Sequence, residues 1–159
     1  MRTTPSSAPL AYHLTLRTFG TWLPGDPRGW HKRSDDARRA PSPALAEWCR
    51  RQMRFSPMIF APAQRVIVAD AIHEVCARRA WWLHTLRVQS NHAHAVITAP
   101  QAPELLVAAL KRAATQSLRD REPALRQREI WARHASTRYL RNPTSVAAAI
   151  CYVRDDHHG

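Results

Sequence analysis

The chain has 159 residues, 45% of them apolar, which is enough for one folded domain with a hydrophobic core, and we expect a single domain over residues 1–159. No apolar run approaches the roughly 18 residues of a membrane span. The first nine residues also lack the apolar stretch of a secretory signal. These absences predict a cytoplasmic protein with no membrane partner.

Basic residues outnumber acidic ones by 24 to 12, and all but two of the 24 are arginines, so the net charge is +12. The planar guanidinium suits phosphate groups and stacks on bases, so the excess favours a nucleic-acid partner. The arginine bias of a GC-rich genome is the alternative. That bias does not account for the shortage of acidic residues.

The first half of the chain begins with a predicted strand at 11–19, where Tyr12, Leu14 and Leu16 alternate with His13, Thr15, Arg17 and Phe19. Six prolines break the next stretch, 24–62, which we interpret as a long insertion after this strand. A short helix at 43–54, capped by Ser42, is expected inside it. Helical spacing of apolar residues then predicts a helix at 63–80.

The second half begins with two predicted strands, 81–88 and 92–99, joined by a short turn as a hairpin. A helix at 103–121 and a strand at 130–141 follow. A last helix at 145–156 is expected to start at a Thr144 or Ser145 cap. This order predicts an α+β, ferredoxin-like (split βαβ) fold, with an antiparallel sheet, two covering helices and an added C-terminal helix.

The cysteines and three of the tryptophans are predicted to lie in the interior of the protein. The cysteines lack any CxxC pair, which predicts free, buried thiols: Cys49, Cys76 and Cys151. Three tryptophans next to apolar strand residues are predicted to lie in the core: Trp81, Trp82 and Trp131.

His92 and His94 are separated by one residue on a predicted strand, so both imidazoles point to the same face. Two such imidazoles can ligate one divalent ion, with an oxygen ligand as the third. The spacing alone is weak, because two surface histidines on a solvated sheet face produce the same pattern.

Three stretches, in order, resemble the single-tyrosine HUH transposases, which include the REP-associated tyrosine transposases and those of small insertion sequences. NHAHAVI at 91–97 is similar to the family's N-H-hydrophobic-H-hydrophobic motif. LRTFGTWLPGDPRGW at 16–30 resembles the RTYGTWLPGDERGW opening of one bacterial branch. STRYL at 136–140 and AICYV at 149–153 are similar to that branch's last strand and catalytic helix.

The resemblance implies metal-dependent cleavage and rejoining of single-stranded DNA, with a DNA hairpin as the expected partner. A tyrosine attacks the phosphate and is joined covalently to the 5′ phosphate, and a Mg²⁺ or Mn²⁺ ion on His92 and His94 polarises the scissile phosphate. The enzyme would act in a bacterial cytoplasm, with the nucleoid, as a monomer or a homodimer.

The resemblance also assigns the nucleophile and the third ligand. Tyr152 corresponds to the family's nucleophile, on a catalytic helix expected within 144–159. The third ligand comes from the same helix, one turn later, where this chain has Asp156 in place of the usual amide. Asp155, His157 and His158 are neighbours able to substitute. A solvated acidic helix end is the alternative for Asp156, and amphipathic packing is the alternative for Tyr152.

Several arginines and two tryptophans are predicted to bind DNA, the arginines through phosphates and the tryptophans by stacking on unpaired bases. They are Arg17, Arg28, Trp22, Trp30, Arg112, Arg119, Arg121, Arg138 and Arg141. The other histidines, including His13, show no spacing typical of paired metal ligands and are expected to be surface residues or buried residues with satisfied hydrogen bonds.

Two rival functions share this fold. An RRM-like binding module has the same element order, but its central strand carries aromatic residues that the HAHAVITA strand lacks. A domesticated relative that binds hairpins without cutting them is the second rival, and the presence of His92, His94 and Tyr152 favours retained chemistry instead.

Overall fold

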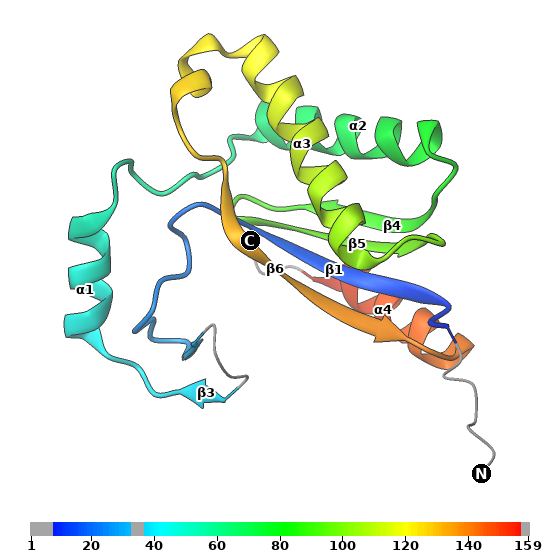
Figure 1. Cartoon of the computed structure of the whole chain (residues 1–159), viewed down its shortest axis with the longest axis horizontal. Helices are drawn as coiled ribbons and strands as arrows, with labels where there is room; N and C mark the ends of the chain where they lie inside the picture. Colours follow the sequence, from blue (N-terminus) through cyan, green and yellow to red (C-terminus); the bar gives the residue numbers. More distant parts are fainter. Residues whose placement is uncertain (1–7, 33–36, 157–159) are drawn as a thin grey trace.

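A computed structural model describes residues 8–32 and 37–156. Its centre is an antiparallel sheet with the strand order β4-β5-β1-β6 (Figure 1). The strands are β1 (Ala11–Thr18), β4 (Trp82–Val88), β5 (His92–Thr98) and β6 (Trp131–Leu140). This order confirms the ferredoxin-like prediction, because each outer strand pairs with one of the two central strands that the split βαβ plan requires.

Two helices, α2 (Pro62–Arg78) and α3 (Pro103–Arg121), cover one face of the sheet (Figure 1). Alternate residues of the central strands, such as Leu14 and Ile97, are fully buried against them. The helices contribute Ile72 and Leu110, which are also fully buried. The main hydrophobic core therefore lies between the sheet and this helical layer.

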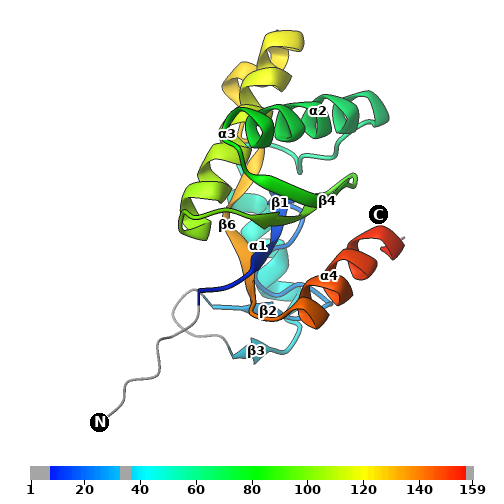
Figure 2. The ribbon, with the colours of Figure 1, turned by 90° about the vertical axis from the view of Figure 1, so that its right-hand side faces the viewer.

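The last helix, α4 (Pro143–Asp155), lies on the opposite face of the sheet (Figure 2). Its Ala149 and Val153 form a second, smaller core with Ala11, Val96 and Leu140. These sheet residues lie where β1 begins and where β5 and β6 end. The helix therefore packs over that part of the face, and the part near Arg17 and His92 faces a pocket.

Every α-helix begins with a proline at its first position, where its missing N–H would have no intrahelical partner. Ser42 caps α1 (Pro43–Gln52) as predicted, accepting a hydrogen bond from the Leu45 N–H. The predicted cap of α4 was wrong. Asn142 caps it instead, accepting from the Ser145 N–H at 2.8 Å, so this helix starts earlier than Thr144.

The segment between β1 and α2 carries a short hairpin of β2 (Trp30–His31) and β3 (Arg38–Arg39), followed by α1. It lies beyond the end of the sheet where β1 stops (Figure 1). Gly25 has a positive φ of 87°, and a Cβ there would clash with the backbone of Ser42 and Ala46 at the start of α1. Ala46 is the single buried residue of α1, so this helix contributes little to the core.

Three sequence-based assignments were wrong. Phe19 was expected on the His13 face but packs against the main core, because β1 ends at Thr18 and the alternation ends with it. Trp82 was assigned to the core but is 70% exposed, since it starts the edge strand β4. Cys151 is exposed and Cys49 is half-buried, so among the cysteines only Cys76 is a buried thiol.

Among the described residues, no helix combines the length and apolar character needed to cross a lipid bilayer.

Candidate metal and DNA-cleavage site

His92 and His94 project from β5 toward α4, while Ala93 and Ala95 between and after them are buried in the main core. The register of β5 with β1 sets Thr15 opposite His94 and Arg17 opposite His92. The two histidines therefore share one face, as the alternation predicts.

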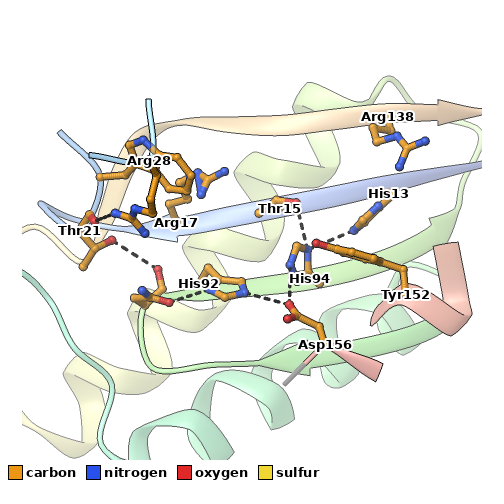
Figure 3. A pocket seen from close by; sticks show the side chains of 12 residues that line it. His13, Thr15, Arg17, Thr21, Arg28, His92, His94, Arg138, Tyr152 and Asp156 are labelled. Atoms are coloured by element: carbon orange, nitrogen blue, oxygen red, sulfur yellow. Dashed lines mark hydrogen bonds and ion pairs between the residues drawn. The ribbon is translucent and has the colours of Figure 1, made fainter. Parts of the chain in front are cut away.

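Asp156, at the C-terminal cap of α4, reaches both histidines (Figure 3). Its Oδ2 lies 3.4 Å from Nε2 of His92 and 3.2 Å from Nε2 of His94. The ligand atoms of the three residues lie within 4.8 Å of one another. Two hydrogen bonds from β4 and the turn after it hold the backbone of this helix end. The buried side-chain amide of Gln89 donates to the Asp156 carbonyl at 2.9 Å, and the Arg87 guanidinium donates to the Arg154 carbonyl at 3.0 Å.

The other ring nitrogen of each histidine also has a partner. Nδ1 of His92 lies 2.6 Å from Oδ1 of Asn91, and Nδ1 of His94 lies 3.0 Å from Oγ1 of Thr15 and 3.1 Å from Nε2 of His13. Each of these partners can accept a hydrogen bond from an Nδ1–H group. With Nδ1 protonated, both Nε2 lone pairs face the Asp156 carboxylate, which is the tautomer a metal ligand needs.

Burial keeps the imidazoles neutral. Burial, together with the repulsion of His92 and His13, lowers the pKa of His94 to about 4. Burial is also the main cause that lowers the pKa of His92, and Asp156 acts in the opposite direction. Neutral imidazole is the form that binds metal ions.

The donor set fits a divalent cation. Adjacent ligands of an octahedral Mg²⁺ ion stand about 3.0 Å apart when the metal–oxygen bonds are 2.0–2.1 Å. The two separations of 3.2 and 3.4 Å from Asp156 approach that value. Two imidazoles and one carboxylate leave coordination positions for other ligands, as in sites that act on phosphates.

Tyr152 lies one turn before Asp156 and reaches from α4 across His94 (Figure 3). Its ring centroid is 5.7 Å from that of His94 and 5.8 Å from that of His13. The side chain is 56% exposed although its ring contacts the buried imidazoles. A substrate therefore has access to the tyrosine beside the three candidate ligands.

These residues line a pocket of about 420 Å³ that also contains arginines. The Nε and Nη2 groups of Arg28 are engaged: they form a bidentate pair with Asp26 at 2.7 Å, and Nη2 also donates to the Thr21 carbonyl at 2.8 Å. Both Arg17 and Arg28 lie over the Trp22 ring, each 4.0 Å from its centroid. Among the described residues the Arg17 guanidinium has no hydrogen-bond partner, and burial followed by the repulsion of Arg28 lowers its pKa.

The structure brings some of the predicted DNA-binding residues to this pocket and places others elsewhere. Arg17, Arg28 and Arg138 line it. Arg112, Arg119 and Arg121 lie on α3, which covers the opposite face of the sheet. Trp30 donates to the Ala40 carbonyl within the insertion, and Arg141 lies 5.7 Å from the ring of the exposed Tyr139.

Three polar residues contact the candidate metal ligands and were not predicted from the sequence: His13, Thr15 and Asn91. His13 was classed as ordinary but is 5% exposed and contacts His94. Alternation set His13 and Thr15 on the face of Arg17, yet it did not give the register that sets Thr15 opposite His94. Asp155, an alternative ligand, is exposed, and His157 and His158 lie outside the described residues.

Comparison with known proteins identifies the family of this chain. Residues 56–150 match the family model described as "Transposase IS200 like", a match that contains both histidines and ends before Tyr152. The matched part is more than half of the chain, so the chain belongs to the IS200-like transposase family, whose members process DNA. No match was found among curated proteins.

Solved structures show the same fold. One similar structure is a REP-associated tyrosine transposase bound to a REP hairpin, with a TM-score of 0.53 and 14% identity over 96% of this chain and 70% of that chain. Another is a protein from Deinococcus radiodurans described as a candidate transposase, with a TM-score of 0.50 and 16% identity over 100% of this chain and 99% of that chain. At these identities the likeness establishes the fold alone.

Proposed function

We propose that this protein cuts and rejoins single-stranded DNA at a site beside a DNA hairpin, through a covalent 5′-phosphotyrosine at Tyr152. The observation that supports this most directly is the convergence of His92, His94 and Asp156, within 4.8 Å of one another, under an exposed tyrosine. The family membership and the hairpin bound by the similar transposase support DNA as the substrate.

His92, His94 and Asp156 would hold a Mg²⁺ or Mn²⁺ ion, which supplies Lewis-acid polarisation of the scissile phosphate. The protein would act as a monomer or a homodimer. The protein would act in the cytoplasm, where genomic DNA is accessible. Residues 1–159 would form one domain, with 24–62 inserted after β1 and the catalytic helix within 144–159.

The reaction is a transesterification in which Tyr152 is the nucleophile. Its hydroxyl oxygen forms a bond to phosphorus and loses its proton, the bond from phosphorus to the 3′ oxygen breaks, and that oxygen leaves as a protonated 3′ hydroxyl. The attack of a free 3′ hydroxyl on the phosphotyrosine reverses the process and rejoins DNA. Arg17, with its guanidinium free of hydrogen bonds among the described residues, would bind a phosphate oxygen and stabilise charge that develops on it.

The decisive experiment is incubation with single-stranded DNA hairpins and Mn²⁺, with covalent protein–DNA adducts separated on a denaturing gel. Tyr152→Phe should bind DNA normally and form no adduct, because it removes the attacking oxygen with little change in packing. Replacing His92 or His94 by alanine should abolish Mn²⁺-dependent cleavage and leave hairpin binding largely intact. The Asp156→Ala variant should cleave more slowly than the wild type, and a higher Mn²⁺ concentration should partly restore its cleavage.

Tyr139→Phe is the matched control, since Tyr139 is also exposed but lies on β6 outside the pocket, and it should keep the adduct. Mass spectrometry of the adduct peptide must locate DNA on Tyr152. DNA on Tyr139 or Tyr12 would overturn the assignment of the nucleophile. Tight hairpin binding without any adduct from the wild type would instead support the non-cutting, domesticated alternative.

A further inference from the structure

A second cavity, of about 580 Å³, lies between α1 and the 3₁₀ turn η1 (Pro123–Gln127). None of the candidate metal ligands lines it, and neither does Tyr152. One wall comes from α1 and the turn after it, including Trp48 and Phe55, and the other from η1 and the residues that follow it, including Arg126 and Arg128. These walls are distant in sequence and are brought together by the fold.

The cavity combines aromatic surface with guanidinium groups. Trp48 is 59% exposed, and the Phe55 ring has the guanidiniums of Arg54 and Arg128 at 5.4 and 5.8 Å from its centroid. Four arginines line it against one glutamate, Glu129. Aromatic faces that stack on bases, with cations that follow the backbone, are the means by which proteins bind single-stranded nucleic acid. An apolar peptide would match the rings but would leave the arginines without a counter-charge.

Trp48 does not contribute to the hydrophobic core of the domain. Ala46 is the only buried residue of α1, so the helix adds little to the core that stabilises the domain. A large aromatic side chain in water gains free energy only when it is covered. Trp48 therefore presents an uncovered ring beside the arginines of this cavity, whereas the exposed Trp82 lines neither this cavity nor the metal pocket.

A single loop separates this cavity from the metal pocket. Thr21 and Trp22 line the metal pocket, while Phe19, Leu23 and Pro24 line the second cavity. Consecutive Cα atoms are about 3.8 Å apart, so the two cavities are neighbours across this loop. A single strand bound at the metal pocket has only this loop to pass before it reaches the second cavity.

We propose that this cavity is a second single-strand subsite, in which Trp48 and Phe55 stack on unpaired bases of the strand whose phosphate lies at the metal site, while Arg54 and Arg126 contact its phosphates. The identity of that strand rests on the proposed function. The binding itself does not, because stacking and phosphate contacts need neither the metal nor the tyrosine.

The test is binding of fluorescein-labelled oligothymidylates of about 4 to 20 nucleotides to the whole protein without divalent metal. Wild-type affinity should rise once the oligonucleotide is long enough to reach the second cavity. Trp48→Ala should remove this rise and weaken binding of the longest oligonucleotide roughly tenfold. Trp82→Ala is the matched control, because Trp82 is still more exposed but lies on the edge strand β4 and lines neither cavity.

Crosslinking locates the contact independently. An oligonucleotide carrying 5-iododeoxyuridine should crosslink to the peptide that contains Trp48 and Phe55. Equal affinity of Trp48→Ala and wild type at every length, equal losses with Trp82→Ala, or equally strong binding of a duplex would each overturn the proposal. If the length-dependent loss is found but the wild type forms no tyrosine adduct, the subsite stands and the cleavage function fails.

Discussion

The imidazole of His94 is oriented by two residues of β1 that sequence analysis did not connect with it. Thr15 and His13 both contact its Nδ1 atom, while its Nε2 atom faces Asp156. Groups that hydrogen-bond the outer nitrogen of a ligating histidine fix its tautomer and ring orientation. We therefore propose that His13 and Thr15 position His94 for the metal ion it would hold.

Removing the Thr15 hydroxyl in Thr15→Val, in combination with His13→Phe, should leave Nδ1 of His94 without a partner. We expect Mn²⁺ affinity, measured by isothermal titration calorimetry, to fall roughly 10- to 100-fold. Cleavage should recover at high Mn²⁺ concentration. Ser136→Ala is the control, because Ser136 pairs with Thr15 across the sheet but is not one of the candidate metal ligands. This variant should bind Mn²⁺ as tightly as the wild type. Unchanged affinity in the double variant would refute the positioning role.

Arg17 is the arginine beside His92 that is available for phosphate, because its neighbour Arg28 is engaged by Asp26 and the Thr21 carbonyl. Arg17→Lys keeps the charge but loses the planar fork and the stack on Trp22. We expect it to bind hairpin DNA nearly as tightly as the wild type and to form the adduct more slowly. Arg17→Ala should slow single-turnover adduct formation by roughly 10²- to 10³-fold. A loss confined to DNA affinity, with an unchanged rate at saturating DNA, would limit Arg17 to binding.

At the scale of elements, the position of Asp156 depends on how the end of α4 is attached to the sheet. The helix itself stops at Asp155, so helical geometry alone does not fix the carboxylate. The Gln89 side chain, which is buried after β4, donates to the Asp156 carbonyl and anchors it.

Gln89→Leu retains the approximate volume of the side chain and removes this hydrogen bond. We expect Mn²⁺ affinity to fall by roughly tenfold, because Asp156 loses its fixed position relative to the histidines. The thermal midpoint should decrease only modestly, as one hydrogen bond contributes about 1 kcal/mol. Arg87→Ala, which removes the exposed contact to the Arg154 carbonyl, should have a smaller effect on the metal. Wild-type Mn²⁺ affinity in Gln89→Leu would show that Asp156 is held by other contacts.

At the scale of the whole molecule, the net charge of +12 is distributed over both faces of the sheet. Arg17, Arg28 and Arg138 gather at the metal pocket, while Arg112 lines a cavity on the helical side. The arginines at the proposed DNA path should displace counterions from the DNA phosphates when DNA binds, and the arginines on the helical side should not.

Hairpin DNA with a single-stranded extension should therefore bind with a strong dependence on salt. Each single-strand phosphate neutralised contributes a slope of about −0.7 to a plot of log K against log salt concentration. We expect Arg138→Ala to make the slope less steep by roughly one contact, and Arg112→Ala to leave it unchanged. A slope near zero for the wild type would mean that the arginines do not contact DNA, and genome composition would then explain their number.

The chain's local patterns determined the fold class and the centre of the site. Alternation of apolar residues specified the four strands, and the order of strands and helices specified the ferredoxin-like plan. The one-residue spacing of His92 and His94 set both on one face, because side-chain direction in a strand has a period of two. Asp156, which followed from the resemblance and its spacing after Tyr152, lies beside both histidines.

Only the tertiary structure decided which residues surround that centre. It fixed the register of β5 against β1, so that His13 and Thr15 contact His94, and it showed that Asp26 engages Arg28 while Arg17 stays available. It also placed Arg112 and Arg121 on the helical side of the sheet, Arg119 at the second cavity and Trp82 in solvent. The physical reason is that strand register and the choice of face depend on contacts between residues far apart in the chain. Local periodicity carries no information about those contacts.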